Sequence, residues 1–408
     1  MISSSAADKA DQPTWQYVQL ADYQLPTTPV TYSARVRFAS FRRLFQRDMP
    51  SQSLPLKAQE KLSSLPECLL ETIAPIPDWR DSASALNTAM SDWLDKDVHR
   101  APVMVIVGAP YSGNSEALQA LAKMQSWRTL DSPAPEQILT GDSGWLSSQV
   151  TGAGPWVLPN LEKVYLRHAE GLQLVRQFIA HACSGNMGKV IIGCDSWAWA
   201  FIQHLWSGPT PAVMTLQAFD EPRLIKYFQG LINASTGGRL LIRLSDDGRY
   251  VLPLPEKHDT GVEYSNFLQI VAAYSRGNFG ITRKIWCSSM QTEPGENQQE
   301  HLGTEQADMS QQTIWIIPWN QLKLPSLPSD IGCNEAFILH ALLLHSGLTQ
   351  EVLQRLLPLP QKSVLATLYR LKEYELVERD NADWQVTPLG YPAVRQFLQS
   401  SRYLVDQF

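Results

Sequence analysis

The sequence lacks the usual marks of a secreted, membrane-spanning or metal-binding protein. Its five cysteines among 408 residues form no C-x-x-C pair, and no histidine stands at a metal-ligand spacing beside them. No apolar run approaches the roughly 18 residues of a membrane span, and the N-terminal stretch MISSSAADKADQ is too polar for a signal peptide. We therefore expect reduced thiols, no structural metal and a cytoplasmic protein.

An excess of positive charge is also missing. The formal net charge is −6, which disfavours a protein that mainly coats nucleic acid, because such binding depends on Lys and Arg neutralising phosphates. The length predicts two or three domains, and the 44% hydrophobic content is enough to bury a core in each. A local basic patch is still compatible with these totals.

Residues 1–60 show no core pattern and contain many Pro, Ser and Thr, which predicts an extended arm. One basic and aromatic stretch stands out within this arm. Its candidate partner-binding residues are Arg35, Arg37, Phe38, Phe41, Arg42 and Arg43. Two interpretations remain open: the aromatic side chains pack on an acidic body, or the stretch docks an acidic partner, an anionic membrane surface or nucleic acid.

The most informative motif is a glycine frame that follows a buried strand. Gly108, Gly113 and Ser115 stand at the spacing of the phosphate-binding pattern G-x-x-x-x-G-K-[ST], but Asn114 occupies the lysine position. In that pattern backbone N–H groups surround a phosphate, Lys reaches the β- and γ-phosphates, and the Ser or Thr hydroxyl holds Mg²⁺. Asparagine carries no charge and is shorter than lysine, so the motif predicts weakened nucleotide binding.

The order of predicted elements after residue 60 indicates an α/β fold followed by helices. Strands alternate with helices over residues 61–218, which predicts a parallel sheet covered on both faces. Residues 219–290 are typical of a helical lid with a hairpin insertion that turns at Asp246 to Gly248. Residues 291–312 contain five acidic residues and no Lys or Arg, which predicts a disordered linker or loop between two folded units. Residues 313–408 have the outline of a winged helix.

This order of parts resembles the AAA+ and STAND branch of P-loop ATPases over about residues 60–405. The resemblance implies an acidic pair after the third strand, where this chain has Pro159 and Asn160; Glu162 and Asp195 are the nearest carboxylates. It also implies a polar sensor at the end of the fourth strand, around Asp195, and an arginine in the lid. The position matching that arginine is Gly280, and Arg276 and Arg283 flank it.

These departures predict a degenerate ATPase. Phosphoryl transfer depends on positioning and on charge stabilisation, and the chain lacks the lysine, the strand-end carboxylates and the matching lid arginine. We expect hydrolysis near background, with no cofactor or only weakly bound ATP or ADP. Another interpretation stays open, in which Gly108 and Gly113 serve the architecture of the strand-to-helix turn alone.

The C-terminal region offers a second candidate binding surface. Lys362 and Arg370 lie on the helix that would enter a DNA groove, yet residues 334–408 contain seven Lys or Arg and eight Asp or Glu. This balance favours a protein-interaction or autoinhibitory module over DNA binding. The sequence therefore predicts a non-catalytic regulator or scaffold that binds a protein partner. The alternatives are a nucleotide-binding switch or slow ATPase with substitute residues, and a DNA-binding regulator.

Overall fold

The computed structural model describes residues 12–27, 62–150, 154–236, 240–254, 263–293 and 312–408. The chain divides into two compact units, and each is described by itself. The core unit comprises Trp15–Gln24, Asp78–Gln217 and Leu324–Phe408, and the accessory unit comprises Met1–Thr14, Leu25–Pro77 and Ala218–Lys323. Each unit therefore combines segments that lie far apart in the sequence.

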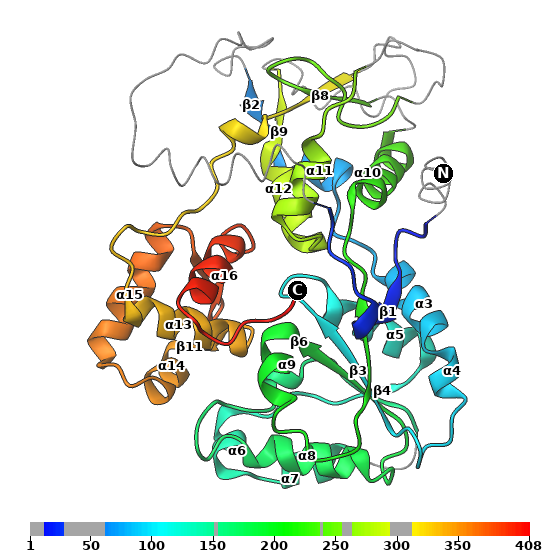
Figure 1. The fold of residues 1–408 in the computed structure, drawn as a ribbon, viewed down its shortest axis with the longest axis vertical. Helices are drawn as coiled ribbons and strands as arrows, with labels where there is room; N and C mark the ends of the chain where they lie inside the picture. Colours follow the sequence, from blue (N-terminus) through cyan, green and yellow to red (C-terminus); the bar gives the residue numbers. More distant parts are fainter. Residues whose placement is uncertain (1–11, 28–61, 151–153, 237–239, 255–262, 294–311) are drawn as a thin grey trace. The chain divides into compact units, whose positions relative to one another are not determined.

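A six-stranded sheet forms the centre of the core unit (Figure 1). In spatial order its strands are β1 (Tyr17–Gln19), β7 (Ala212–Leu216), β3 (Val103–Gly108), β6 (Val190–Asp195), β5 (Trp156–Leu158) and β4 (Arg128–Thr129). All neighbours pair in parallel except β1, which pairs antiparallel with β7. Every residue of β3 and β6 is buried, as expected for parallel strands covered on both faces. The prediction of a mixed α/β fold with a parallel sheet is confirmed.

Helices cover both faces of this sheet. Figure 1 shows α3 (Arg80–Ala89) and α5 (Asn114–Gln125) on one side and α9 (Ser196–Ile202) on the other. The remaining helical elements are α4 (Ser91–Leu94), α6 (Pro135–Thr140), α7 (Gly144–Gln149), η3 (Leu161–Lys163) and α8 (Gln173–Cys183). The connection from β3 to α5 is the glycine frame. It therefore lies at the carboxyl end of a central strand, next to the ends of β6 and β7, where parallel sheets bind ligands.

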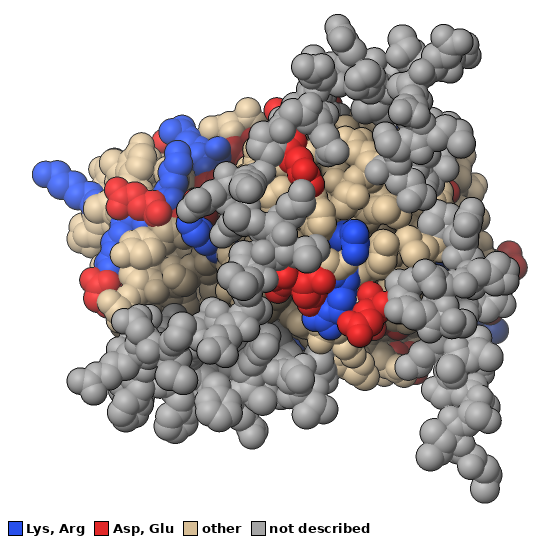
Figure 2. All heavy atoms as spheres, turned by 90° about the horizontal axis from the view of Figure 1, so that it is seen from above, with Lys and Arg blue, Asp and Glu red and all other residues tan. Residues whose placement is uncertain are grey.

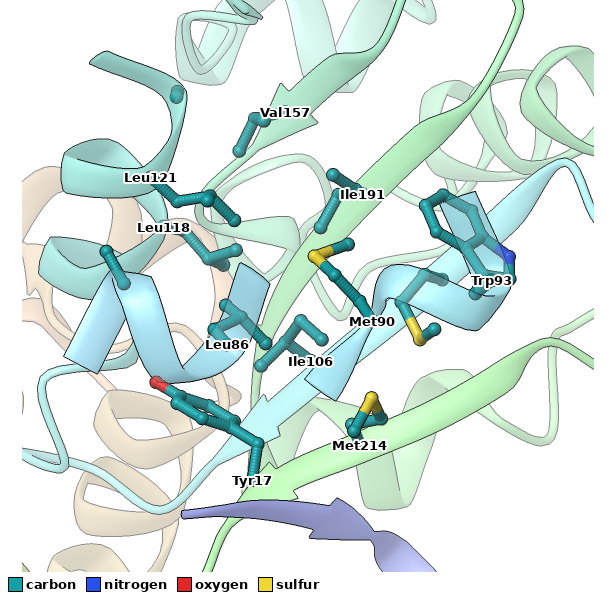
Figure 3. Close-up of a cluster of buried hydrophobic side chains, with 13 residues drawn as sticks. Tyr17, Leu86, Met90, Trp93, Ile106, Leu118, Leu121, Val157, Ile191 and Met214 are labelled. Carbon is teal, nitrogen blue, oxygen red and sulfur yellow. The ribbon is translucent and has the colours of Figure 1, made fainter. Parts of the chain in front are cut away.

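An apolar cluster joins α3, α5 and the sheet (Figure 3). Leu86, Ile106, Leu118 and Ile191 pack together there with Tyr17, whose hydroxyl lies 3.0 Å from Ser82 Oγ. Sequence analysis assigns residues 1–60 to an extended arm, whereas the structure places Tyr17 in the sheet and buries it. A strand of three residues is too short to show the period-two pattern by which strands are recognised.

In its described residues the accessory unit combines four α-helices and the 3-10 helix η4 (Trp319–Gln321) with a second sheet. The α-helices are α2 (Glu67–Ile73), α10 (Glu221–Thr236), α11 (Phe267–Tyr274) and α12 (Phe279–Ser289). The sheet has the order β2 (Ser63–Ser64), β9 (Met290–Thr292), β10 (Gln312–Ile316) and β8 (Leu240–Leu244). The apolar centre includes Phe228 stacked on Trp286, with ring centroids 4.4 Å apart. Helices are thus present where the sequence analysis expects them in residues 219–290, together with a sheet that the sequence analysis does not predict.

Strand β10 changes the assignment of two predicted segments. It pairs in parallel with β8 and antiparallel with β9, so Gln312–Ile316 belongs to the accessory unit instead of the C-terminal region. Residues 291–312, predicted as a linker between two folded units, begin in β9 and end in β10, two neighbouring strands of one sheet. Residues 294–311 lie outside the described part of the chain. The pairing is non-local, which is why a sequence pattern does not reveal it.

The C-terminal module, defined here as residues 333–408, belongs to the core unit. Its elements are α13 (Cys333–Leu344), β11 (Leu348–Thr349), α14 (Gln350–Leu356), α15 (Gln361–Glu373), β12 (Val377–Asp380), β13 (Asp383–Val386) and α16 (Tyr391–Ser400). The three short strands form a sheet in the order β11, β13, β12. Helix α13 is buried on nearly all sides because it packs against α9, α15, α16 and β13. Among the described residues, the structure contains no helix of the length and apolarity that a membrane crossing requires.

Candidate functional site

Both glycines of the phosphate-loop frame are required by local packing. Gly113 precedes α5 with a φ of 80°, in the left-handed region, and a side-chain carbon added there would overlap the Trp79 ring. A side-chain carbon at Gly108 would overlap the Ser112 hydroxyl and Asn114. The frame thus has an architectural explanation that needs no phosphate.

The side chain of Asn114 forms a hydrogen bond within the strand-to-helix connection. Its side-chain Nδ2 donates to the backbone carbonyl of Ile106 at 2.9 Å, so the amide turns back toward strand β3. This bond satisfies a carbonyl group close to the end of the strand. The residue in the lysine position therefore braces the strand-to-helix turn, and it supplies no charge.

Four polar side chains form a network at the carboxyl ends of β5 and β6. In the amide orientation that satisfies both of its ends, Asn160 donates to Ser115 Oγ at 3.0 Å and to Glu162 Oε1 at 3.2 Å. Glu162 Oε2 accepts from the Asp195 backbone N–H at 3.0 Å. Asp195 Oδ1 accepts from the Trp197 N–H at 2.9 Å and thereby caps α9. The two carboxylates that the sequence analysis names as nearest to the strand end lie close together, and both accept hydrogen bonds from groups of the protein.

Burial controls the charge of this carboxylate pair. Glu162 is 5% exposed and Asp195 8% exposed. Desolvation raises the pKa of Glu162, and desolvation followed by the nearby Glu162 charge raises the pKa of Asp195 well above its ordinary value. The pair therefore holds protons more readily than exposed carboxyls do. In the described part of the chain, no group of three or more His, Cys, Asp or Glu side chains is placed to hold a metal ion.

The loop and the strand ends enclose a cavity of about 220 Å³. Its other wall belongs to the C-terminal module, through Leu342, Leu343, Ser346 and Gly347 near the end of α13 and Gln385 and Val386 of β13. The described lining includes three carboxylates, Glu116, Glu162 and Asp195, and contains no Lys, Arg or His. The volume is below the roughly 300–1,000 Å³ of ordinary ligand pockets.

Three hydrogen-bonded links hold the C-terminal module over the loop. The Tyr111 hydroxyl of the loop donates to the Val386 carbonyl, and Tyr111 has a φ of 67°, uncommon for a residue other than glycine. Ser346 Oγ donates to Asp195 Oδ2 at 3.1 Å. Lys163 Nζ donates to the carbonyls of Ser346 and Gly347, each at 3.0 Å, so its charge is directed to the module. A motif search misses these links because none of them has a local sequence pattern.

The remaining predicted site residues lie elsewhere. Arg276 and Arg283 belong to the accessory unit, where Arg283 donates to the carbonyls of Ala74 at 2.6 Å and Pro75 at 3.1 Å. Lys362 is exposed on the first turn of α15. Arg370 pairs with Asp330 and with Glu335, the latter at 3.1 Å. The basic and aromatic stretch Arg35, Arg37, Phe38, Phe41, Arg42 and Arg43 lies outside the described residues.

Two buried histidines, His340 on α13 and His345 at its C-terminal end, make the stability of this region depend on pH. Desolvation lowers the pKa of His340 to about 4 and that of His345 to about 3, whereas an unfolded histidine titrates near 6.5. Between these folded-state pKa values and pH 6.5, the two histidines are therefore mostly neutral in the native state and mostly protonated in the unfolded chain. The stability that the neutral histidines contribute is complete above pH 6.5, and it is lost as the pH falls toward their folded-state pKa values.

We expect His345→Gln to make the free energy of unfolding less dependent on pH between 6.5 and 4. The wild-type slope should exceed that of the variant by up to about 1.4 kcal/mol per pH unit. Glu162 and Asp195 act in the opposite direction, because raised carboxyl pKa values contribute stability that is lost as the pH rises through them. Their contribution is common to both proteins, so urea denaturation at several pH values measures the difference. Parallel slopes would contradict the buried neutral histidine.

Comparisons with known proteins find similarity among solved structures alone. No protein-family model and no curated protein matches the chain. The Holliday junction branch migration motor RuvB of Thermotoga maritima aligns over 80% of this chain and 95% of its own, at 11% identity and a TM-score of 0.31. A RuvB mutant gives the same coverage and identity with a TM-score of 0.32. A Walker-type ATPase of Pyrococcus abyssi aligns over 77% and 95%, at 12% identity and 0.30.

Proposed function

We propose that this chain is a regulatory or scaffold protein, built on a P-loop ATPase-like core that does not hydrolyse ATP. The observation that carries this proposal is the charge of the loop cavity. Its described lining has Glu116, Glu162 and Asp195 and no cationic side chain. A triphosphate and its transition state need fixed positive charge, which this cavity does not supply.

The magnitudes favour exclusion of the nucleotide. The N-terminus of α5 attracts an anion by about 0.3–1 kcal/mol, the usual value for a helix end. The lining supplies no cation to add to this attraction. Any lining carboxylate that ionises opposes it, because a unit negative charge 4 Å from a phosphate repels the phosphate by about 4 kcal/mol at an effective dielectric constant of 20. The proposed cofactor state is therefore none, or weakly bound ATP or ADP.

The order of elements in the C-terminal module supports a winged-helix arrangement, with α13, α14 and α15 followed by the β12–β13 hairpin. We propose that this module binds protein, with DNA not favoured. Arg370 on α15 is paired with Asp330 and Glu335, so its guanidinium is not available to base edges. Residues 334–408 contain seven Lys or Arg and eight Asp or Glu. Elsewhere the charges are mixed as well: on the one face of the molecule that Figure 2 draws, the visible Lys and Arg side chains are interspersed with Asp and Glu. A DNA-binding face would instead concentrate positive charge.

A protein partner has aromatic side chains to contact on the same helix. Tyr369 is 50% exposed, and the nearby Tyr374 is 42% exposed. Tyrosine supplies a large contact area with a hydrogen-bonding tip, and it is frequent at energetically important interface positions. The Arg and Phe stretch of residues 34–47 remains a second candidate for a partner or a membrane surface.

An ATPase assay tests the proposal. Purified protein should release phosphate from Mg·ATP at a rate no higher than its Ser115→Ala variant, because the cavity supplies no cation for the triphosphate and Ser115 Oγ is already hydrogen-bonded to Asn160 and Gln119. Asn160→Ala serves as a matched control that disturbs the same network. A Mg²⁺-dependent rate in the wild type that disappears in Ser115→Ala would establish the alternative function, a slow ATPase with substitute residues.

A further inference from the structure

A second cavity of about 440 Å³ lies in the core unit, beneath the opposite face of α13 from the loop cavity. Ala341, Leu344 and His345 line it, whereas Leu342, Leu343 and Ser346 line the loop cavity. Residues three and four apart share a helix face, so the two cavities occupy opposite sides of the same turn. This second cavity belongs to no part of the phosphate-loop site.

The second cavity is cationic and aromatic. Besides α13, its walls come from residues 356–358 after α14, residues 401–404 after α16, and Arg167. Arg167 and Arg402 both border it, and the described lining contains no Asp or Glu. We propose that this cavity binds a small organic carboxylate with an aromatic or branched apolar body.

Arg167 is positioned by a neutral histidine. Its Nη1 lies 3.2 Å from His340 Nδ1, and its guanidinium lies 5.8 Å from the centre of the Phe201 ring. Because a guanidinium only donates, His340 Nδ1 must accept, and the ring proton then sits on Nε2, which donates to the Leu404 carbonyl at 3.1 Å. One bond to His340 leaves several N–H donors of Arg167 for a carboxylate. The described residues offer Arg167 no carboxylate partner.

Arg402 occupies a position where glycine is the usual residue. It follows α16 with a φ of 60°, and the next residue, Tyr403, donates its N–H to the Leu398 carbonyl at 3.0 Å, as in a helix-ending Schellman motif. A side chain in this left-handed conformation costs backbone energy that glycine avoids. No hydrogen bond or ion pair joins the Arg402 side chain to the described residues. A carboxylate ligand would explain why a cation stands there.

The apolar walls define the body of the ligand. Phe337 meets Tyr403 edge-on at 6.3 Å between ring centroids, and Tyr403 meets His340 at 5.0 Å. Phe337 is 38% exposed and Leu404 42% exposed, so apolar surface remains for a ligand to cover. The volume of the cavity falls within the usual range for small-molecule sites.

The charge of the site selects a carboxylate. Arginine remains protonated at all physiological pH values, and its planar fork matches the two oxygens of a carboxylate. Burial lowers the pKa values of His340 and His345, so both are neutral near pH 7 and the two arginines supply the charge. A compact monoanion with an apolar body fits this combination better than a hydrated phosphate does.

Isothermal titration calorimetry on the full chain tests this proposal with benzoate, 4-methylpentanoate and 3-phenylpropionate. We expect saturable binding of at least one acid, ten or more times tighter than that of 3-phenylpropanol or inorganic phosphate. Arg402→Gly should weaken acid binding at least tenfold while leaving the melting temperature equal or higher, because glycine relieves the left-handed strain. Arg176→Gln, on the exposed side of α8, is the matched control and should bind as the wild type does.

Three results would overturn the carboxylate site. The first is that none of the three acids binds saturably at concentrations up to about 10 mM, where even a ligand with a Kd near 1 mM would be largely bound. The second is that the alcohol or phosphate binds as tightly as the acids. The third is that Arg402→Gly leaves the affinity for the acids unchanged. Arg167→Gln gives a second reading from the opposite side of the cavity, and it should also lose affinity at least tenfold. This proposal does not depend on the proposed lack of ATP hydrolysis, so each of the two can fail alone.

Discussion

Asp406→Ala is expected to lower the free energy of unfolding by about 3–5 kcal/mol, the range for breaking a buried ion pair by removing one partner. Asp406 is 4% exposed and pairs with Arg395 Nε at 3.0 Å. It also accepts hydrogen bonds from Ser196 Oγ and from Tyr391 O–H, the latter at 3.3 Å. Since Arg395 is only 7% exposed, the variant would leave a buried cation without its counter-charge.

Chemical denaturation of three variants shows whether the loss of stability comes from the buried ion pair or would follow the removal of any carboxylate. Asp380→Ala, at the exposed end of β12, should change the free energy of unfolding by less than about 0.5 kcal/mol, as surface substitutions usually do. The double substitution Arg395→Met with Asp406→Leu should recover most of the loss, because apolar replacement of a buried pair is often neutral. A loss below about 1 kcal/mol in Asp406→Ala would contradict the pairing. The hydrogen bond from Ser196 to Asp406 also joins helix α9 to the C-terminal module.

Gly113→Ala is expected to lower the free energy of unfolding by about 2–5 kcal/mol in the absence of any nucleotide. The left-handed backbone costs an alanine about 1–2 kcal/mol, and overpacking adds about 1–3 kcal/mol. The overpacking arises because the new methyl group would overlap the Trp79 ring. The measurement is the denaturation midpoint of the ligand-free protein.

A double-substitution cycle assigns the loss to its two sources. Trp79→Ala should remove the overlap, so the added cost of Gly113→Ala in that background should fall to the backbone contribution of about 1–2 kcal/mol. Gly230→Ala provides a contrast, because Gly230 lies inside α10 with open space around it and alanine favours a helix. An unchanged midpoint in Gly113→Ala would show that the loop tolerates a side chain there. The glycine would then need an explanation other than packing.

Local patterns in the sequence predict the central sheet well. The run of buried residues in β3, the glycine frame and the alternation of strands with helices all depend on neighbours in the chain, so the parallel α/β arrangement follows from them. The sequence analysis also names Glu162 and Asp195 as the nearest carboxylates, and both line the loop cavity, Asp195 as the last residue of β6 and Glu162 in η3 after β5. Asn114, singled out as an uncharged replacement, proves to have a structural partner in Ile106.

Non-local pairings account for what the sequence does not reveal. Tyr17 joins a sheet whose neighbouring strand begins at Ala212, and Gln312 pairs with Leu240. The wall that the C-terminal module contributes to the loop cavity depends on single contacts, such as Tyr111 to Val386, that have no motif. The contribution of Asp406 to stability also has no sequence motif, because it depends on the burial of this carboxylate beside Arg395. Such features depend on tertiary packing.

Calorimetric titration of the wild type with Mg·ATP is the most direct test of the central claim, that the loop cavity lacks the charge to hold a triphosphate. We predict no saturable binding with a Kd below about 1 mM, which corresponds to a binding free energy no stronger than about −4 kcal/mol. A sub-millimolar, Mg²⁺-dependent Kd that Ser115→Ala removes would contradict the claim.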